Sequence, residues 1–226
     1  DLFRSPAVVD DAVIDAILAE VLPAVAPGAV VIDHTTTSFV GSRARAARAA
    51  AAGVEFLHAP VFMSPAAAAR GKGIMLCAGA PEVFARVDGA LAAMTGDLWY
   101  VGADHGRAAA MKLCGNAMIM AITAGMADAL AIGRSGGLAG ADVLEVMTRL
   151  KPGGAIELRG KKMAEGDFTA SFELTMARKD LGLMLDAVAP APLAALAAIA
   201  ARADQLIAAG HGADDLGVLA LATPAT

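Results

Sequence analysis

The sequence predicts an α/β domain followed by an all-α domain. As far as residue 103, short apolar or β-branched runs alternate with helical patterns. Beyond that point no convincing strand follows, and glycines and prolines separate a series of Ala-rich helical segments. Alternation of strands with helices is typical of βαβ crossovers, so we expect a largely parallel, partial Rossmann-like sheet. We place the two domains at residues 1–103 and 104–226.

The elements of the first half follow from periodicity and from the residues that interrupt it. Apolar positions at helical spacing predict an opening helix over residues 7–21, which Pro23 and Pro27 end. The expected strands are 29–32, 54–57, 74–77 and 98–101, and the expected helices between them are 41–52 and 81–94.

The second half begins with a long helix, predicted over residues 106–134, that would link the two halves. Its alanines reflect helix propensity. The most apolar stretch, residues 117–127, is too short to span a bilayer and is bracketed by Asn116 and Asp128. We therefore expect a buried helix and no membrane partner.

Composition narrows the function classes. With 57% hydrophobic residues and a mean hydropathy of +0.60, the 226 residues can bury a large core. A net charge of −5 argues against a nucleic-acid partner, which requires a basic footprint. We interpret Arg43, Arg45 and Arg48 as a solvated helix face.

Cysteine usage and the N-terminus indicate the cytoplasm. Cys77 and Cys114 stand in apolar contexts, which suits buried free thiols in a reducing compartment. No charged segment followed by an apolar core and a cleavage site opens the chain. Cysteines, histidines and carboxylates show no metal-ligand spacing, so we expect no metal.

Lys112 and Asn116 are the strongest candidates for chemistry. Residues four apart share one face of a helix, so an ammonium and an amide here can address the same substrate oxygen. The structural alternative is that Lys112 lays its stem along apolar surface and keeps its charge in water. A second Lys-Asp pair, Lys179 and Asp180, opens another apolar stretch and favours a shared anionic or carbonyl ligand.

The segment Asp33–Ser38, with hydroxyls at its last four residues, directly follows a predicted strand. This position is the carboxyl edge of the sheet, where open α/β folds bind ligands. Helix capping is the alternative, since Ser and Thr are favoured N-caps. No strand runs into a glycine-rich nucleotide motif, so either the sheet binds no nucleotide or its first strands precede Asp1. A parallel sheet that starts with a crossover helix favours the second possibility.

These residues together resemble the β-hydroxyacid dehydrogenase family, which includes 3-hydroxyisobutyrate dehydrogenases, tartronate semialdehyde reductases and glyoxylate reductases. The similarity runs over nearly the whole chain, through Asp33–Ser38, Ala59–Val61, Gly106–Asn116, Lys179–Leu181 and His211–Asp215. It implies a Rossmann-like domain, a 6-phosphogluconate dehydrogenase-like C-terminal domain, and hydride transfer between NAD or NADP and a carbonyl or alcohol. It also implies a small-molecule substrate and a homodimer or higher homo-oligomer.

The resemblance carries roles over to individual residues. Lys112 becomes the catalytic lysine and Asn116 its substrate-orienting partner. Leu2, Phe3, Thr36 and Lys179 match cofactor-lining positions, with Thr36 near the nicotinamide ribose. By the same alignment, the pyrophosphate site lies outside this sequence.

The departures from the family pattern concern the substrate. Phe62, Met63 and Ser64 stand where family members carry Ser-Gly-Gly, so we expect a more apolar pocket without the usual carboxylate clamp. Gly115 replaces the first of two asparagines, and Ala108 replaces a glycine. Imine reductases share the architecture, and many carry Asp or Tyr at the position of Lys112, so the lysine favours carbonyl chemistry over imines. A non-catalytic dimerisation or ligand-binding module is the remaining alternative.

Overall fold

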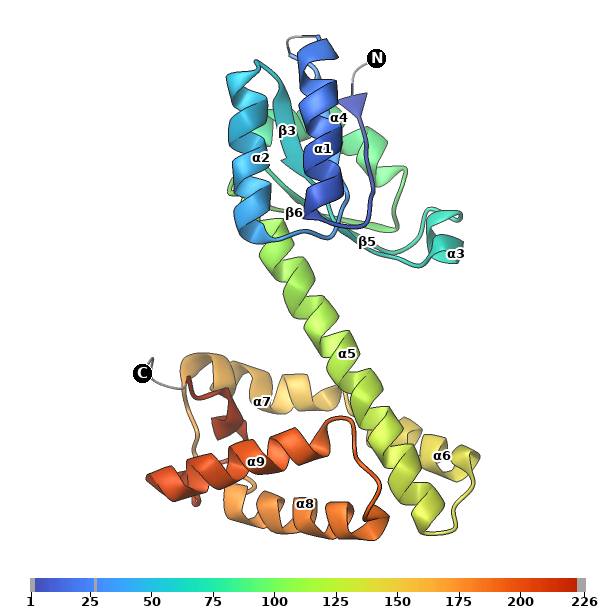
Figure 1. The fold of residues 1–226 in the computed structure, drawn as a ribbon, viewed down its shortest axis with the longest axis vertical. Coiled ribbons are helices and arrows are strands. Elements are labelled where there is room, and N and C mark those ends of the chain that lie inside the picture. Colours follow the sequence, from blue (N-terminus) through green and yellow to red (C-terminus); the bar gives the residue numbers. More distant parts are fainter. Residues whose placement is uncertain (1–2, 27, 223–226) are drawn as a thin grey trace. The chain divides into compact units, whose positions relative to one another are not determined.

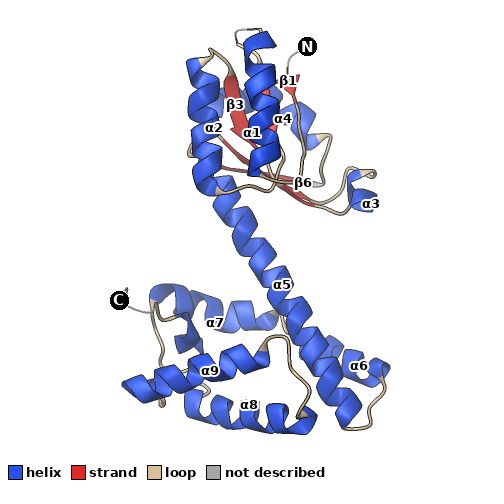
Figure 2. Cartoon of the chain, in the orientation of Figure 1, coloured by secondary structure: helices blue, strands red, loops and turns tan. Residues whose placement is uncertain are grey.

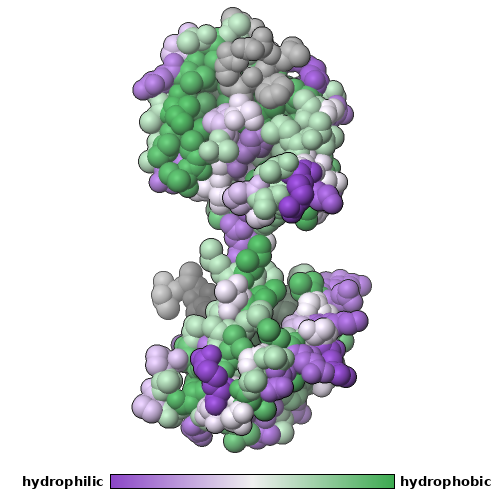
Figure 3. Space-filling model, turned by 90° about the vertical axis from the view of Figure 1, so that its right-hand side faces the viewer, coloured by the Kyte–Doolittle hydropathy of each residue, from purple (hydrophilic) through white to green (hydrophobic). Residues whose placement is uncertain are grey.

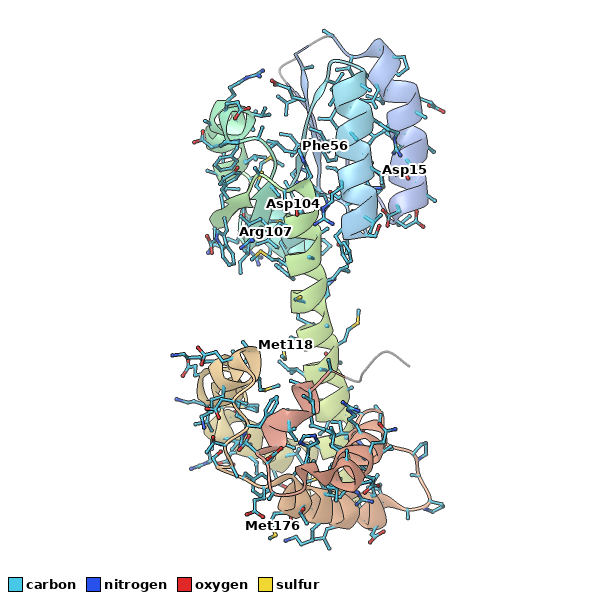
Figure 4. All side chains as sticks on the ribbon, turned by 90° about the vertical axis from the view of Figure 1, so that its left-hand side faces the viewer. Asp15, Phe56, Asp104, Arg107, Met118 and Met176 are labelled. Atoms are coloured by element: carbon cyan, nitrogen blue, oxygen red, sulfur yellow. The ribbon has the colours of Figure 1, made fainter. Side chains whose placement is uncertain are left out.

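The computed structural model describes residues 3–26 and 28–222, which form two compact units, Asp1–Met118 and Ile119–Thr226 (Figure 1). The strands lie in the first unit and the second is helical, as predicted (Figure 2). The predicted boundary at 103/104 falls at the start of helix α5 (His105–Ser135), and the units divide further along that helix, after Met118 (Figure 4).

The sheet of the first unit has six strands. They are β1 (Phe3–Arg4), β2 (Val30–Asp33), β3 (Glu55–His58), β4 (Val61–Phe62), β5 (Ile74–Ala78) and β6 (Asp97–Gly102). Strands β1, β2 and β3 run parallel in this order, whereas β5 pairs antiparallel with β3 and β4 and parallel with β6. Three of the five strand pairings are parallel, so the expectation of a largely parallel sheet is confirmed, with β5 antiparallel to β3 and β4 as the departure. A parallel neighbour needs a long crossover, and the connection between β3 and β5 holds only the two-residue strand β4 and the four-residue helix α3 (Pro65–Ala68).

Helices cover both faces of this sheet. On one face α1 (Asp11–Val21) and α2 (Phe39–Ala51) pack on Val31 and Phe56, and on the other α4 (Pro81–Ala92) packs on Val30, Ile32 and Leu57 (Figure 1). Successive strand residues point to opposite faces, which is why β2 is buried at all four positions. The sheet thus forms the middle of a three-layer domain.

Most predicted elements of this unit lie within a few residues of their observed bounds. Helix α1 begins at Asp11 instead of residue 7 because Asp10 caps it, with the side chain accepting from the Val13 N–H. The prediction that the half opens on a helix is wrong, because Phe3 and Arg4 pair with Val30 and Val31. Two residues are too few to give a periodic sequence signal.

The second unit contains the C-terminal part of α5 and four further α-helices. They are α6 (Gly140–Leu150), α7 (Gly154–Glu165), α8 (Leu174–Val188) and α9 (Leu196–Leu206), followed by short helical turns at Ile207–His211 and Leu216–Ala220. Leu174, Ala203, Leu206 and Val218 form its core.

Helix α5 corrects one expectation. By length and composition it is the one helix in the described ranges that passes as a candidate membrane span, with a hydropathy of 1.4. Only 6% of its most apolar window is buried, so the prediction of a buried helix over 117–127 is wrong. Apolar composition shows that a helix needs a packing partner, but it does not identify that partner.

Asp128, within α5, organises the second unit. Its carboxylate accepts the backbone N–H groups of Ala194, Ala195 and Leu196, so it caps α9 from a distant part of the chain. Burial by itself would raise the pKa of Asp128, but the three N–H donors outweigh it and hold the pKa below its usual value. A charge at this depth is stable because every donor that it satisfies would otherwise be orphaned at a helix start.

Replacing Asp128 with Ala should lower the free energy of unfolding by ~2 kcal/mol, because the start of α9 loses its acceptor. Urea unfolding followed by circular dichroism measures the change. Asp186→Ala, which removes an exposed carboxylate from α8, is the matched control and should stay within ~0.5 kcal/mol of the unchanged protein. Equal effects of the two substitutions would contradict the capping role.

Candidate active site

Lys112 and Asn116 lie together on α5 within the first unit. Lys112 Nζ donates to Asn116 Oδ1 at 2.9 Å, as their four-residue spacing predicts. The lysine is only 7% exposed, and this burial lowers its pKa below the usual value. A lysine withdrawn from water in this way exchanges its proton more readily near neutral pH than a surface lysine does.

Phe62 supplies the third member of this group. Its ring centroid lies 3.9 Å from Lys112 Nζ, within the range of a cation–π contact. The ring belongs to an apolar cluster with Met111 and the buried residues Leu76, Val101 and Ala108. Residues from β5, β6 and α5 therefore pack around the ring that faces the ammonium group.

Met63 and Ser64 do not join Phe62. They line a groove of about 600 Å³ together with His34, Met75 and Met94. The Ser64 hydroxyl caps α3 by accepting the Ala67 N–H at 3.2 Å. The predicted substrate segment is thus divided, with Phe62 at the lysine and the next two residues at the groove, because neighbouring residues of an extended chain point in opposite directions.

His34 is the polar group of that groove. Its Nδ1 donates to the Ala59 carbonyl at 2.7 Å, and its Nε2 therefore accepts from the Ser5 hydroxyl, also at 2.7 Å. Burial lowers the pKa of His34, so the imidazole is neutral at pH 7. This arrangement ties the end of β2 to the chain segments that follow β1 and β3.

The hydroxyl run after β2 confirms the capping alternative for Ser38, and ligand binding by this run stays a prediction. Ser38 caps α2 through the Gly41 N–H, Thr35 accepts from the Val8 N–H, and Thr37 faces His58. Thr36 is exposed, and its side chain has no hydrogen bond to the residues that the structure describes. Three hydroxyls therefore serve the fold, and Thr36 is left facing solvent at the carboxyl edge of the sheet.

A buried charge cluster holds this segment in place. The side chain of Arg45 is fully buried, with its Nε 3.5 Å from the Asp33 carboxylate, which is equally buried. Its Nη1 donates to Asp11 at 2.9 Å and to Asp15 at 3.2 Å. The interpretation of the three arginines as one solvated face is therefore wrong for Arg45, although Arg43 and Arg48 are about half exposed.

Sequence reasoning missed this cluster, although a signal was present. Asp11 and Asp15 are four apart on α1, and Arg45 and Arg48 are three apart on α2, so each pair occupies one helix face. Matching acidic and basic faces on adjacent helices could have predicted their pairing. The contact of Phe62 with Lys112 had no such signal, because the two residues are distant in sequence and differ in chemistry.

The two cysteines differ in their surroundings. Both are free, but Cys77 is buried in the sheet, which raises its pKa to about 12, whereas Cys114 is exposed on α5. The expectation that both are buried is wrong for Cys114. It shares a helix with Lys112 but points away from the buried side.

The other predicted cofactor residues lie apart from this group or outside the described side chains. Leu2 lies outside the described residues, and Phe3 lies in β1. Lys179 is exposed on α8 in the second unit and pairs with Asp180 at 3.0 Å. Its cofactor role, like the roles of Lys112, Asn116 and Thr36, stays a prediction. Among the described residues no cluster of His, Cys, Asp and Glu could hold a metal ion.

Two family models cover most of the chain. One, described as the NAD binding domain of 6-phosphogluconate dehydrogenase, matches residues 6–102. The other, described as NAD-binding of NADP-dependent 3-hydroxyisobutyrate dehydrogenase, matches residues 106–222. Fold and matches thus define an NAD-binding dehydrogenase architecture. Within it, the chain belongs to the β-hydroxyacid dehydrogenase family, as its motifs predict.

Curated relatives support this assignment. The chain is 34% identical to a 3-hydroxyisobutyrate dehydrogenase of Pseudomonas aeruginosa, over 78% of this chain and 63% of the relative. It is 31% identical to an L-threonate dehydrogenase of Cupriavidus necator, over 85% of this chain and 66% of that relative. The chain therefore spans less than two thirds of the length of these relatives.

Solved structures show the same fold in more distant proteins. An imine reductase from Myxococcus stipitatus in complex with NAD⁺ has a TM-score of 0.88 at 20% identity, covering 97% of this chain and 79% of that one. A reductive aminase from Aspergillus terreus in complex with NADPH4, cyclohexanone and allyl amine has a TM-score of 0.84 at 22% identity, covering 97% and 78%.

The family resemblance places Thr36 near the nicotinamide ribose of the cofactor. Thr36 offers an exposed hydroxyl at the carboxyl edge of β2, where open α/β folds bind ligands. A pyrophosphate needs a glycine-rich turn at a helix N-terminus, and no G-x-G-x-x-G motif occurs in residues 1–226. The cofactor contact of Thr36 stays a prediction.

Lowering the pH from 7 to 5 should destabilise the protein through His34 and His58. Burial lowers the pKa of both below the value of about 6.5 in an unfolded chain. Below that pH the unfolded chain takes up protons first, so the free energy of unfolding falls as the pH falls. Thermal melting across this range measures the slope.

His34→Gln should flatten this pH dependence, because one of the two titrating groups is gone. Gln205→Ala, at an exposed position without a titrating group, is the control and should keep the slope of the unchanged protein. A wild-type slope in His34→Gln would contradict this origin of the pH dependence.

Proposed function

We propose that the protein is an NAD(P)-dependent dehydrogenase or reductase that transfers hydride between nicotinamide and a carbonyl or alcohol carbon, with Lys112 as the proton donor or acceptor. The observation that carries this proposal is the buried ammonium of Lys112, held by Asn116 and faced by an aromatic ring. Membership in a dehydrogenase family supports it.

The three N–H bonds of the Lys112 ammonium point to different partners. One is donated to Asn116 Oδ1, and a second faces the Phe62 ring. The third is free for the oxygen of a substrate. A bound nicotinamide would supply the hydride in the reducing direction. Lys112 would donate its proton to the carbonyl oxygen, and the resulting neutral amine would regain a proton from water.

The environment of the lysine suits this exchange in both directions. Burial lowers the pKa of Lys112, so the neutral amine forms at a lower pH than in water. A neutral amine can accept the proton of an alcohol in the oxidising direction. General acid–base assistance of this kind typically contributes about 10²–10⁴-fold in rate.

We further propose that Thr36 and Lys179 contact the cofactor, which is NAD or NADP. Thr36 is supported by its exposed hydroxyl at the carboxyl edge of β2. Lys179 is supported by its exposure and by the family motif Lys179–Leu181. No residue among those described is identified as a contact of the ribose 2′ position, so NAD and NADP should both be tested.

The substrate is a small molecule that is less polar than a short hydroxy acid. Phe62 covers the ammonium with a ring where a carboxylate clamp would need small polar residues. An imine is the second candidate, because solved imine reductases share the fold. The lysine favours an oxygen substrate, because an ammonium protonates a carbonyl oxygen directly. The acidic charge and the apolar core favour a cytoplasmic enzyme without nucleic acid or membrane as partner.

Lys112→Ala should lower kcat by about 100-fold or more and leave the dissociation constants of NADH and NADPH nearly unchanged. Cofactor fluorescence titration measures binding, and a panel of aldehydes, ketones, imines and small hydroxy acids measures turnover. Lys161→Ala, which removes an exposed lysine from α7, is the matched control.

Several results would contradict the proposed function. Unchanged turnover in Lys112→Ala would return Lys112 to a structural role. Absence of cofactor binding by the full-length protein would favour a non-catalytic dimerisation or ligand-binding module. Clearly faster turnover of small hydroxy acids than of aldehydes would contradict the proposed apolar substrate pocket.

We also propose that a second copy of the chain covers part of α5. Met118, Ile119, Ile122 and Met126 recur at helical spacing along one side of α5, and each is 39–56% exposed. Apolar side chains are also exposed on other helices of the second unit, including Met176 on α8 (Figure 4). Figure 3 shows hydrophobic residues among polar ones on one face of the second unit. Contiguous apolar patches of this kind mark association surfaces.

The protein should therefore behave as a homodimer or larger homo-oligomer in detergent-free buffer. Light scattering after size exclusion at micromolar concentration gives the mass. Ile122→Lys should shift it toward a single copy, because it places a charge within the apolar stripe. Ala127→Lys, an exposed position on another side of α5, is the control. A monomeric unchanged protein would contradict this proposal.

A further inference from the structure

The Phe62 ring fills the space that a side chain at residue 115 would occupy. A Cβ atom at Gly115 would lie 2.6 Å from Cε1 of the Phe62 ring and closer still to its Cζ. Real Cβ atoms do not approach that closely, so the ring can occupy this position only while residue 115 is glycine. Both residues are departures from the family pattern, and the structure joins them in one contact.

The same ring lies against Lys112. Its centroid is 3.9 Å from Nζ, and Gly115 and Lys112 are three residues apart on one side of α5. The missing side chain at residue 115 therefore allows the ring to reach the ammonium. An alanine there would push the ring away from the lysine.

We propose that Phe62 is a positioning residue that holds and shields the Lys112 ammonium, and that Gly115 is the specificity-determining position that admits its ring. This inference rests on the proposed catalytic role of Lys112. The ring leaves the ammonium only Asn116 and the reacting oxygen as polar partners, so it selects a substrate whose reacting end is neutral and weakly hydrated.

The ring acts on the lysine in two opposite ways. It excludes water, which disfavours the charged form, and its π face attracts the ammonium, which favours that form. Burial lowers the pKa of Lys112, and the ring is part of that burial, so loss of the whole ring should raise the pKa. A leucine at residue 62 would keep most of the exclusion and lose the attraction, whereas an alanine would lose both.

Among the described residues, no neighbouring charge is recorded as a cause of the pKa shift of Lys112, so the effects of the Phe62 variants can be compared directly. Burial is the only recorded cause of the lowered pKa of Lys112. The packing partners from β5 and β6 are apolar: Leu76, Ala78 and Val101. On α5 the ionisable neighbours are Arg107, whose side chain approaches Gly102, and the exposed Cys114.

The test measures the titration of Lys112 in the full-length protein without turnover. Trace acetylation by acetic anhydride at a series of pH values, read by peptide mass spectrometry, gives the midpoint for each lysine. Lys72 and Lys161 are exposed references in the same sample. Phe62→Leu should move the Lys112 midpoint down by roughly half a pH unit to one unit. Phe62→Ala should move it up, toward the ordinary value of about 10.4.

The glycine is tested in the same assay. Gly115→Ala should shift the midpoint in the direction of Phe62→Ala, because the new Cβ displaces the ring. Adding Gly115→Ala to Phe62→Ala should have no further effect, because the ring is already gone. Gly89→Ala on α4, where a Cβ meets no atom within 4 Å, is the matched control and should leave the midpoint unchanged.

The outcomes are separable. The proposal is overturned if Phe62→Leu does not lie below the unchanged protein, or if Gly115→Ala keeps the wild-type midpoint. Melting curves show which variants fold, and if Phe62→Ala does not, the leucine variant decides. Since the titration needs no substrate, its failure is distinct from a failure of the hydride-transfer proposal, which Lys112→Ala tests. If the positioning role of Phe62 and the catalytic role of Lys112 are both correct, the pH profile of kcat should shift in the same direction as the Lys112 midpoint in each variant.

Discussion

The fully buried ion pair between Arg45 and Asp33 is the constraint on which the first unit depends. It joins the middle of α2 to the end of β2, and Asp11 and Asp15 extend it to α1. Removing one partner of such a pair typically costs about 3–5 kcal/mol, because the other charge stays buried alone. The pair fixes the start of the Asp33–Ser38 segment, where Thr35 N–H donates to Asp33. That geometry leaves Thr36 as the exposed hydroxyl at the edge of the sheet.

The second buried charge, Lys112, is stabilised by different partners from those of Arg45. Arg45 is stabilised by carboxylates, whereas Lys112 has one amide oxygen and one aromatic face. This weaker compensation accompanies a pKa of Lys112 below its usual value, which burial causes. The first unit therefore contains one buried cation that serves the architecture and a second that is the proposed proton donor or acceptor.

The comparisons and the site constrain function at different levels. Relatives at 31–34% identity define the family and a redox cofactor. Solved structures at about 20% identity establish the fold and include enzymes that are named for imines and amines. Because one fold carries both chemistries, the choice between them depends on individual groups at the site. In this chain those groups are a lysine, an amide and a phenylalanine ring.

The sequence by itself determined the class of both halves, most helices and strands, the family, and the pairing of Lys112 with Asn116, because these depend on local periodicity and on a four-residue helical spacing. Only the tertiary structure decided that β5 runs antiparallel to β3, that Arg45 is buried, and that Phe62 separates from Met63 and Ser64. It also decided that Phe62 lies over Gly115 and Lys112. Each of these results depends on contacts between segments that are distant in the chain, and no local pattern records which segments meet.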